Sequence, residues 1–141
     1  MTKISNTLKE ISNKLFNIDE NIVELGDSIL YFINIIQEEF KKDPRLLTRV
    51  IKLINEDYKF VKYPIFVNER GDIYFLLDNK KTLINTSKNI DIKKSDAKRV
   101  GTLALNMHLN NNPNILDLLN NFKDIILKEK SKLETQDKIK Y

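Results

Sequence analysis

The sequence of 141 residues contains no cysteine. This absence excludes disulfide bonds, thiolate nucleophiles, iron–sulfur clusters and cysteine-ligated zinc. It also gives no support to a secreted ligand, because small secreted domains usually depend on disulfides. Glycine and proline are scarce, with three of each. Few positions therefore interrupt regular structure, and we expect long helices.

Histidine occurs once, at position 108, and the sequence has no glycine-rich phosphate loop, dinucleotide fingerprint or paired metal-ligand motif. A Ser-His-Asp triad or a histidine-ligated zinc would need His108. Because His108 lies at the polar end of an expected helix, we predict that it is exposed or caps that helix. Glu20, Glu24 and Asp27 have helical spacing but lie opposite the apolar residues, which favours a solvated acidic face. We predict a protein that is not an enzyme and uses no metal, cofactor or small-molecule substrate.

Long hydrophobic runs are also missing. No apolar run approaches the roughly 18 residues that cross a bilayer, and residues 1–10 lack the features of a signal peptide. We expect a cytoplasmic protein without membrane contact, with one helical domain at residues 1–133 and a flexible tail at 134–141. The abundance of Asn, Lys and Ile is typical of an AT-rich genome, such as that of a virus, a plasmid or a low-GC microbe.

The first third of the sequence contains a strong apolar repeat. Its apolar residues recur at alternating spacings of four and three, which places one apolar seam along a helix. The residues of this N-terminal seam are Ile4, Leu8, Ile11, Leu15, Ile18, Ile22, Leu25, Ile29, Phe32 and Ile36. No proline interrupts the pattern and Gly26 is its only weak point, which favours one helix over residues 3–41. Two antiparallel helices with a turn near residues 17–21, the second capped by Asp19, are the alternative.

Three further helices are expected. Asp43 and Pro44 suit the N-cap and the first position of the second helix. Ser95 is expected to cap a helix at about 96–110, and Asn112 and Pro113 precede a last helix at about 113–133. The residues expected to face the core are Leu46, Leu47, Val50, Ile51, Ile54, Tyr58, Ala97, Val100, Leu103, Ala104, Met107, Ile115, Leu118, Leu119, Phe122, Ile125 and Ile126.

Residues 65–67 and 73–77 are aromatic and β-branched runs around a glycine-containing turn, which is typical of a β-hairpin. Either Arg70-Gly71 or Gly71-Asp72 fits a two-residue loop. We interpret the Arg-Gly-Asp tripeptide as this turn and not as an adhesion motif. A third strand is expected at 82–84. The predicted fold class is mainly α: a helical bundle with a long N-terminal heptad-patterned helix and an inserted β-hairpin or meander at about 64–85.

In either turn register, apolar side chains project from both faces of the hairpin. One face is expected to carry Ile65, Val67, Tyr74 and Leu76, and the other Phe66, Ile73, Phe75 and Leu77. A small sheet normally has one core face and one solvated face, so we predict that part of the second face contacts a protein partner. The candidate partner interface, which also includes residues of the N-terminal seam for self-association or bundle closure, comprises Phe66, Ile73, Phe75, Leu77, Ile4, Leu8, Ile11 and Leu15.

Positive charge is concentrated between residues 80 and 99, where only Asp91 and Asp96 are acidic. The candidates for anion or nucleic-acid binding are Lys80, Lys81, Lys88, Lys93, Lys94, Lys98 and Arg99. This basic segment reaches an expected helix N-terminus, where free amides favour phosphates, although a solvated loop is the alternative. We predict a protein that acts through protein–protein contacts, as an assembly subunit or as a regulator or inhibitor on a partner's surface. A nucleic-acid-binding regulator is the alternative function.

Overall fold

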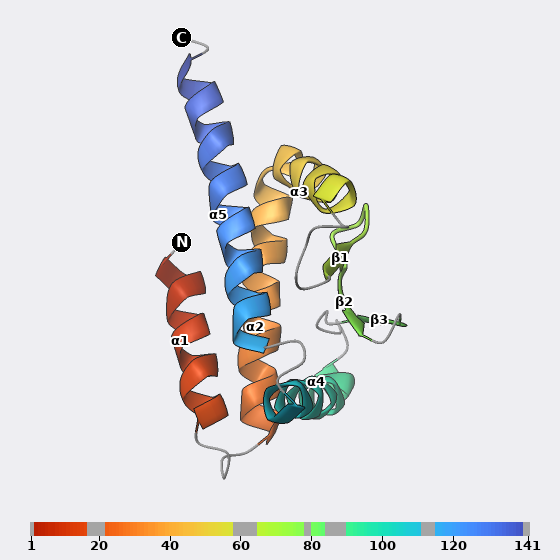
Figure 1. Ribbon diagram of the computed structural model, residues 1–141. Helices are drawn as coiled ribbons and strands as arrows, with labels where there is room; N and C mark the ends of the chain where they lie inside the picture. The colour runs from red at the N-terminus through yellow and green to blue at the C-terminus, as the bar shows by residue number, and fades with distance from the viewer. Residues whose placement is uncertain are drawn as a thin grey trace.

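The computed structural model describes residues 2–16, 22–57, 65–77, 80–83, 90–110 and 115–139. Side chains are described in these ranges except at residues 2, 16, 55–57, 75–77, 80–83, 90–96, 110 and 139. Within these ranges the chain forms five helices and one three-stranded sheet. The prediction of a mainly helical bundle with an inserted hairpin is therefore confirmed (Figure 1).

The N-terminal third forms two helices, α1 (Thr2–Phe16) and α2 (Ile22–Lys42). They pack side by side and run antiparallel (Figure 1). The prediction of one helix over residues 3–41 is wrong, and the alternative of two antiparallel helices is confirmed. The proposed turn at 17–21, with its Asp19 cap, lies outside the described residues. Ile4 and Ile11 of α1 and Ile29 of α2 are fully buried, because both helices turn their part of the seam toward the same core.

Asp43 separates α2 from α3 (Pro44–Asp57) and caps the second of these helices. The backbone N–H of Arg45 donates to Asp43 Oδ1 at 3.1 Å, and the fixed φ of Pro44 suits the first helical position. The N–H of Asp43 still donates to the Glu39 carbonyl at 3.1 Å. Asp43 thus marks the boundary between the two helices. The predicted roles of Asp43 as the N-cap and of Pro44 as the first residue of the helix are both confirmed. Of the residues expected to face the core in α3, Tyr58 lies outside the described residues.

Strands β1 (Ile65–Val67), β2 (Ile73–Leu77) and β3 (Lys80–Leu83) form an antiparallel sheet in that order. The N–H of Asn68 donates to the Asp72 carbonyl at 3.1 Å, and the N–H of Gly71 donates to the Asn68 carbonyl at 2.9 Å. Gly71 has a φ of 85°. This pattern is typical of a three-residue hairpin loop that ends in a left-handed residue. Neither of the predicted two-residue loops is correct.

The loop length decides which strand residues share a face of the sheet. Directly paired residues lie on one face, and the observed pairs are Phe66 with Tyr74 and Val67 with Ile73. A loop with an even number of residues would have turned one strand over relative to the other. The prediction that Ile65 and Val67 share a face with Tyr74 is therefore wrong. They share it with Ile73, and all three are buried, whereas Phe66 and Tyr74 are half-buried.

Helices α4 (Ile90–Asn110) and α5 (Ile115–Ile139) are both longer than predicted. Ser95 lies inside α4 and does not cap it. The predicted end of the last helix at residue 133 is also wrong, because α5 continues to Ile139. Asn112 and Pro113 lie outside the described residues. Most of the predicted core positions of these two helices are buried, namely Ala97, Val100, Ala104, Met107, Ile115, Leu118, Leu119, Phe122 and Ile126.

Helix α4 crosses α2 at very close range (Figure 1). A Cβ atom at Gly26 of α2 would overlap the backbone carbonyl of Ala97, and a Cβ atom at Gly101 of α4 would overlap the carbonyl of Ile22. The absence of both side chains lets the two backbones touch. This contact holds α4 across one end of the bundle, while α3 lies at the other end and the sheet lies between α3 and α4 (Figure 1).

Candidate functional site

The candidate partner residues of the N-terminal seam lie inside the bundle. Ile4, Leu8, Ile11 and Leu15 are each at most 6 % exposed, and α1 packs against α2 and α5. The seam therefore closes the chain on itself, which is one of its two predicted roles. The assignment of these four residues to a surface for a separate partner is wrong, because their own chain already covers them.

The hairpin residues of the candidate interface differ in how far they are buried. Ile73 is fully buried, so its assignment to a partner surface is wrong for the same reason. Phe66 is half-buried and its ring lies against that of Tyr74, with the ring centroids 5.8 Å apart and an interplanar angle of 58°. The side chains of Phe75 and Leu77 lie outside the described residues. Among the described side chains of the predicted interface, Phe66 thus keeps exposed area. It forms an aromatic pair with Tyr74, which was expected on the other face of the hairpin.

The Arg-Gly-Asp tripeptide is bonded back to its own chain. Asn68 Nδ2 donates to Asp72 Oδ2 at 2.9 Å, and the N–H of Asp72 donates to Asn68 Oδ1 at 2.9 Å. Gln37 of α2 donates from Nε2 to the Gly71 carbonyl at 3.0 Å, and Arg70 Nε lies 3.4 Å from Asp72 Oδ2. The interpretation of the tripeptide as the hairpin turn is confirmed. These bonds also fix the hairpin tip on α2.

The basic segment is described only in part. Lys98 and Arg99 are exposed on α4. The side chains of the other five candidates are not among those described: Lys80, Lys81, Lys88, Lys93 and Lys94. The backbone places Lys80 and Lys81 on β3 and Lys93 and Lys94 in the first turns of α4, and Lys88 lies outside the described residues. The structure therefore shows two exposed cations on one helix and does not test whether the seven form one patch.

The single histidine and the acidic residues of α2 do not form a metal-binding group among the described residues. His108 is half-buried in the last turn of α4. Glu24 and Asp27 are exposed on α2, and Glu20 lies outside the described residues. In the part of the chain that the structure describes, no group of three or more His, Asp or Glu side chains could hold a metal ion.

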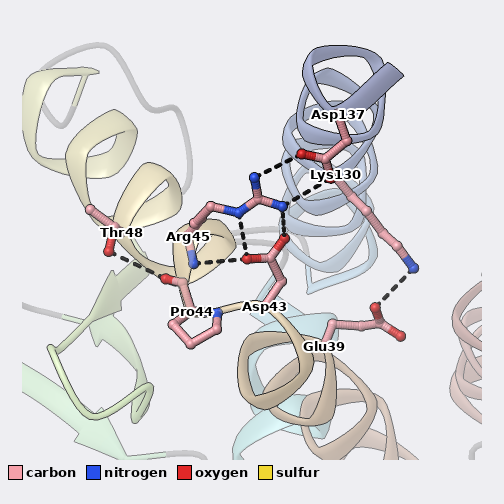
Figure 2. Close-up of polar contacts among 7 residues, drawn as sticks. All are labelled: Glu39, Asp43, Pro44, Arg45, Thr48, Lys130 and Asp137. Carbon is pink, nitrogen blue, oxygen red and sulfur yellow. Dashed lines mark hydrogen bonds and ion pairs between the residues drawn. The ribbon is translucent and has the colours of Figure 1, made fainter. Parts of the chain in front are cut away.

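A network of ion pairs joins the α2–α3 corner to the C-terminal half of α5 (Figure 2). Arg45, in the first turn of α3, donates from Nε and Nη2 to Asp43 at 2.9 and 2.8 Å. It also donates from Nη1 and Nη2 to Asp137 of α5 at 2.9 and 3.1 Å. The hydrogen bonds to Asp137 and then to Asp43 raise the pKa of Arg45, and its guanidinium lowers the pKa of Asp43. Planar bidentate pairing of this kind fixes the geometry of both partners.

Two more pairs continue the network along α5. Lys130 Nζ donates to Glu39 Oε2 at 2.9 Å, and Arg49 Nε donates to Glu129 Oε2 at 3.0 Å. Burial raises the pKa of both carboxyls, but the cationic partners lower it by more, so each pKa lies below its ordinary value of 4.5. Glu129 is 4 % exposed and also lies 3.4 Å from Lys132 Nζ. The two carboxylates are thus held in their charged form.

A pocket of about 160 Å³, called here the corner pocket, lies beside these ion pairs. Leu46 and Leu133 line it, together with charged residues of both signs: Glu39, Lys42, Asp43, Lys130, Glu134 and Asp137. Among the described side chains, no buried nitrogen or oxygen lacks a hydrogen-bond partner. Two ion pairs at the corner pocket join α5 to the other two helices: Lys130 with Glu39 of α2, and Asp137 with Arg45 of α3.

Sequence reasoning did not find this network. Arg45 and Asp137 are 92 residues apart in the chain, and exposed charges leave no periodic signal that would relate them. The one available hint was the excess of charged residues in the last helix. That excess does not indicate which residues of the other helices these charges would pair with.

Comparison with family models, curated proteins and solved structures finds no match for this chain. Among the helices in the described ranges, none combines the length and the hydropathy of a membrane span. The function must therefore be inferred from the chain's own residues.

Proposed function

We propose that the protein is not an enzyme and acts through protein–protein contacts, as an assembly subunit or as a regulator that occupies a partner's surface. The observation that carries this proposal is the half-buried aromatic pair, Phe66 and Tyr74. The pair lies on the face of the sheet opposite buried Ile65 and Val67. Aromatic side chains supply large contact area with few rotatable bonds, and they are enriched at protein interfaces.

The hairpin that carries the aromatic pair is held in place from behind. Ile73 is fully buried, and Gln37 of α2 bonds the Gly71 carbonyl at the tip. A partner would therefore meet a surface that is already ordered. Preorganisation of this kind lowers the entropic cost of binding, which supports the aromatic pair as a contact point.

The test replaces both rings and compares the partners that the protein captures from its native host. Phe66→Ser combined with Tyr74→Ser should abolish the capture of a discrete protein that the wild type retains. Tyr31→Ser is the matched control, because it removes an exposed aromatic ring, 49 % exposed, from α2. All variants are first compared by thermal melting, so that a loss of folding is recognised. If the double variant folds and still retains the partner, the aromatic pair is not the contact.

Nucleic-acid binding by the basic segment is the second proposal, and the exposure of Lys98 and Arg99 on α4 supports it. Binding to plain duplex and single-stranded DNA is measured by fluorescence anisotropy over a range of salt concentrations. Reversing Lys98 and Arg99 to Glu should weaken binding and reduce the salt slope, since fewer counterions are released. Reversing Lys3 and Lys9 of α1, which are both exposed, makes the same change of net charge as a control. An absence of binding at low salt would leave the protein-contact proposal alone.

A further inference from the structure

The two halves of α5 are attached to the bundle in different ways. Leu118, Leu119 and Phe122 in the first half are at most 1 % exposed. In the second half, from Glu129 onward, Leu133 is the one apolar side chain that belongs to the described core. The side chains of residues 134–138 are all exposed. The first half is thus packed into the core, and the second half lies on the surface of the α2–α3 corner.

Three ion pairs hold this second half on the other helices. Three of its residues pair with α2 and α3: Glu129 with Arg49, Lys130 with Glu39, and Asp137 with Arg45. The side chains of the Arg45–Asp137 pair are 49 % and 50 % exposed, and the cations of the other two pairs are 32 % and 34 % exposed. Solvent therefore reaches every one of the three pairs.

The corner pocket shows that the apolar contact beneath these pairs is incomplete. Its volume of about 160 Å³ lies between Leu46 of α3 and Leu133 of α5, among the charged side chains. A closely packed helix contact leaves few voids of this size. The second half of α5 therefore gains little dispersion energy from the surface on which it lies.

We propose that residues 129–139 of α5 form a latch segment, held by charge, that opens locally from the α2–α3 corner while the rest of the bundle stays folded. Segments with few buried apolar contacts open with small free energies. The exposed Arg45–Asp137 pair contributes little and is screened by salt, whereas the other two pairs, whose carboxylates are 11 % and 6 % exposed, are screened less. A rise in ionic strength therefore favours the open state. Opening exposes Leu46 and Leu133 to solvent, so the latch segment controls access to the apolar part of the corner pocket.

Amide hydrogen exchange on the full chain, followed by mass spectrometry at low and high salt, tests the proposal directly. The backbone amides of the latch segment should exchange about fivefold faster at high salt, because three pairs are screened together. The amides of residues 118–126 in the same helix serve as the internal reference and should not change. Equal acceleration in both halves would show global unfolding and would overturn the proposal. Exchange in the latch segment that is slow and independent of salt would overturn it as well.

A pair of matched variants locates the effect. Lys130→Glu replaces an attraction to Glu39 by a repulsion and should open the latch segment already at low salt. Lys128→Glu makes the same change of charge at an exposed position two residues away and should leave exchange as in the wild type. If the two variants behave alike, the charge of α5 as a whole matters and the specific pairs do not. Because the wild-type measurement needs no substitution, failure of a variant to fold leaves the test intact.

Discussion

The α2–α4 crossing and the α2–α3–α5 corner are both helix contacts, but opposite kinds of interaction hold them. At the crossing the backbones touch, because Gly26 and Gly101 have no side chains, and Ala97 is fully buried between the helices. At the corner, the helices are joined by ion pairs beside a pocket (Figure 2). The two contacts lie toward opposite ends of α2 (Figure 1).

This difference has consequences for how each end responds to change. Close-packed contacts are short-ranged, so they are sensitive to a single added methyl group and almost insensitive to salt. Exposed charge contacts tolerate changes of shape but depend on pH and ionic strength. The four predictions below change one contact at a time, beginning with the largest expected loss of stability.

A charge placed in the apolar seam should cause the largest loss. Ile11 of α1 is fully buried, so Ile11→Asp places an unpaired carboxylate in the core and should cost about 4 kcal/mol or more in the free energy of unfolding. Asn13→Asp adds the same charge at an exposed position of the same helix and should change stability by less than about 0.5 kcal/mol. Urea denaturation measures both. Similar midpoints for the two variants would contradict the burial of the seam.

A methyl group at the crossing should cause the next largest loss. Gly26→Ala improves helix propensity by about 1 kcal/mol, but the new Cβ overlaps the Ala97 carbonyl and forces the backbones apart. We expect a net loss of about 3 kcal/mol. Asn34→Ala is the control, since it changes an exposed position of the same helix. A Gly26→Ala variant with an unchanged or higher melting temperature would show that the helices do not touch there.

The break between α1 and α2 shows what an apolar repeat can and cannot predict. The spacing of Ile4, Ile11 and Ile29 predicted correctly that these side chains are buried. It did not predict the change of direction, because two antiparallel helices on one core need the same spacing as one long helix. The stretch Asn17 to Asn21 contains neither glycine nor proline, so the strongest signals of a helix break are absent and the possible Asp19 cap was the local indication of one.

The hairpin shows a second limit, which arises from loop length. The strands and the role of Gly71 were predictable from residue type. The pairing of Phe66 with Tyr74 was not, because it depends on whether the loop has an odd or an even number of residues. The ion pairs of α5 were not predictable either, since they join residues far apart in sequence. Local chemistry was therefore predictable, and the parts of the candidate surfaces that depend on tertiary geometry were not.

Removal of the most buried charge at the corner should cause a moderate loss that depends on pH. Glu129→Gln leaves Arg49 without its carboxylate and should cost about 1 to 3 kcal/mol at neutral pH. The pKa of Glu129 in the folded protein lies below its ordinary value of 4.5, because the Arg49 and Lys132 interactions outweigh burial. The carboxylate therefore contributes stability above pH 4.5, and this contribution is lost as the pH falls through the folded pKa.

Denaturant titrations from neutral to acidic pH test whether the stability contributed by Glu129 falls as the pH falls. The difference between wild type and Glu129→Gln should be largest at neutral pH and should shrink as the pH falls below 4.5. Glu39 and Asp43 also have lowered pKa values. Because the variant retains both carboxylates, its own stability should still fall in acid, but by less than that of the wild type. Glu134→Gln makes the same substitution at an exposed carboxylate of α5 and is the control. A difference that grows in acid would mean that Glu129 is not stabilised in its charged form.

The smallest loss of global stability should follow Arg45→Gln, although Arg45 makes more ion-pair contacts than any other side chain drawn in Figure 2. Its guanidinium and both carboxylates are largely or partly exposed, so water replaces much of what is removed. Asp43 keeps its hydrogen bond to the backbone N–H of residue 45, and the cap of α3 survives. What the substitution does remove is the attraction across the corner, and in its place Asp43 and Asp137 repel each other.

We therefore expect a melting temperature close to that of the wild type, together with faster amide exchange in the latch segment, residues 129–139, at low salt. At high salt this exchange difference should disappear, because the lost attraction is already screened in the wild type. Arg70→Gln removes the same group at the hairpin tip, where its side chain is 82 % exposed, and should leave α5 unchanged. If Arg45→Gln instead lowered global stability as much as Glu129→Gln, the exposed pair would be part of the cooperative core. The ion pairs of the corner would then contribute to global stability, as the close packing of the α2–α4 crossing does.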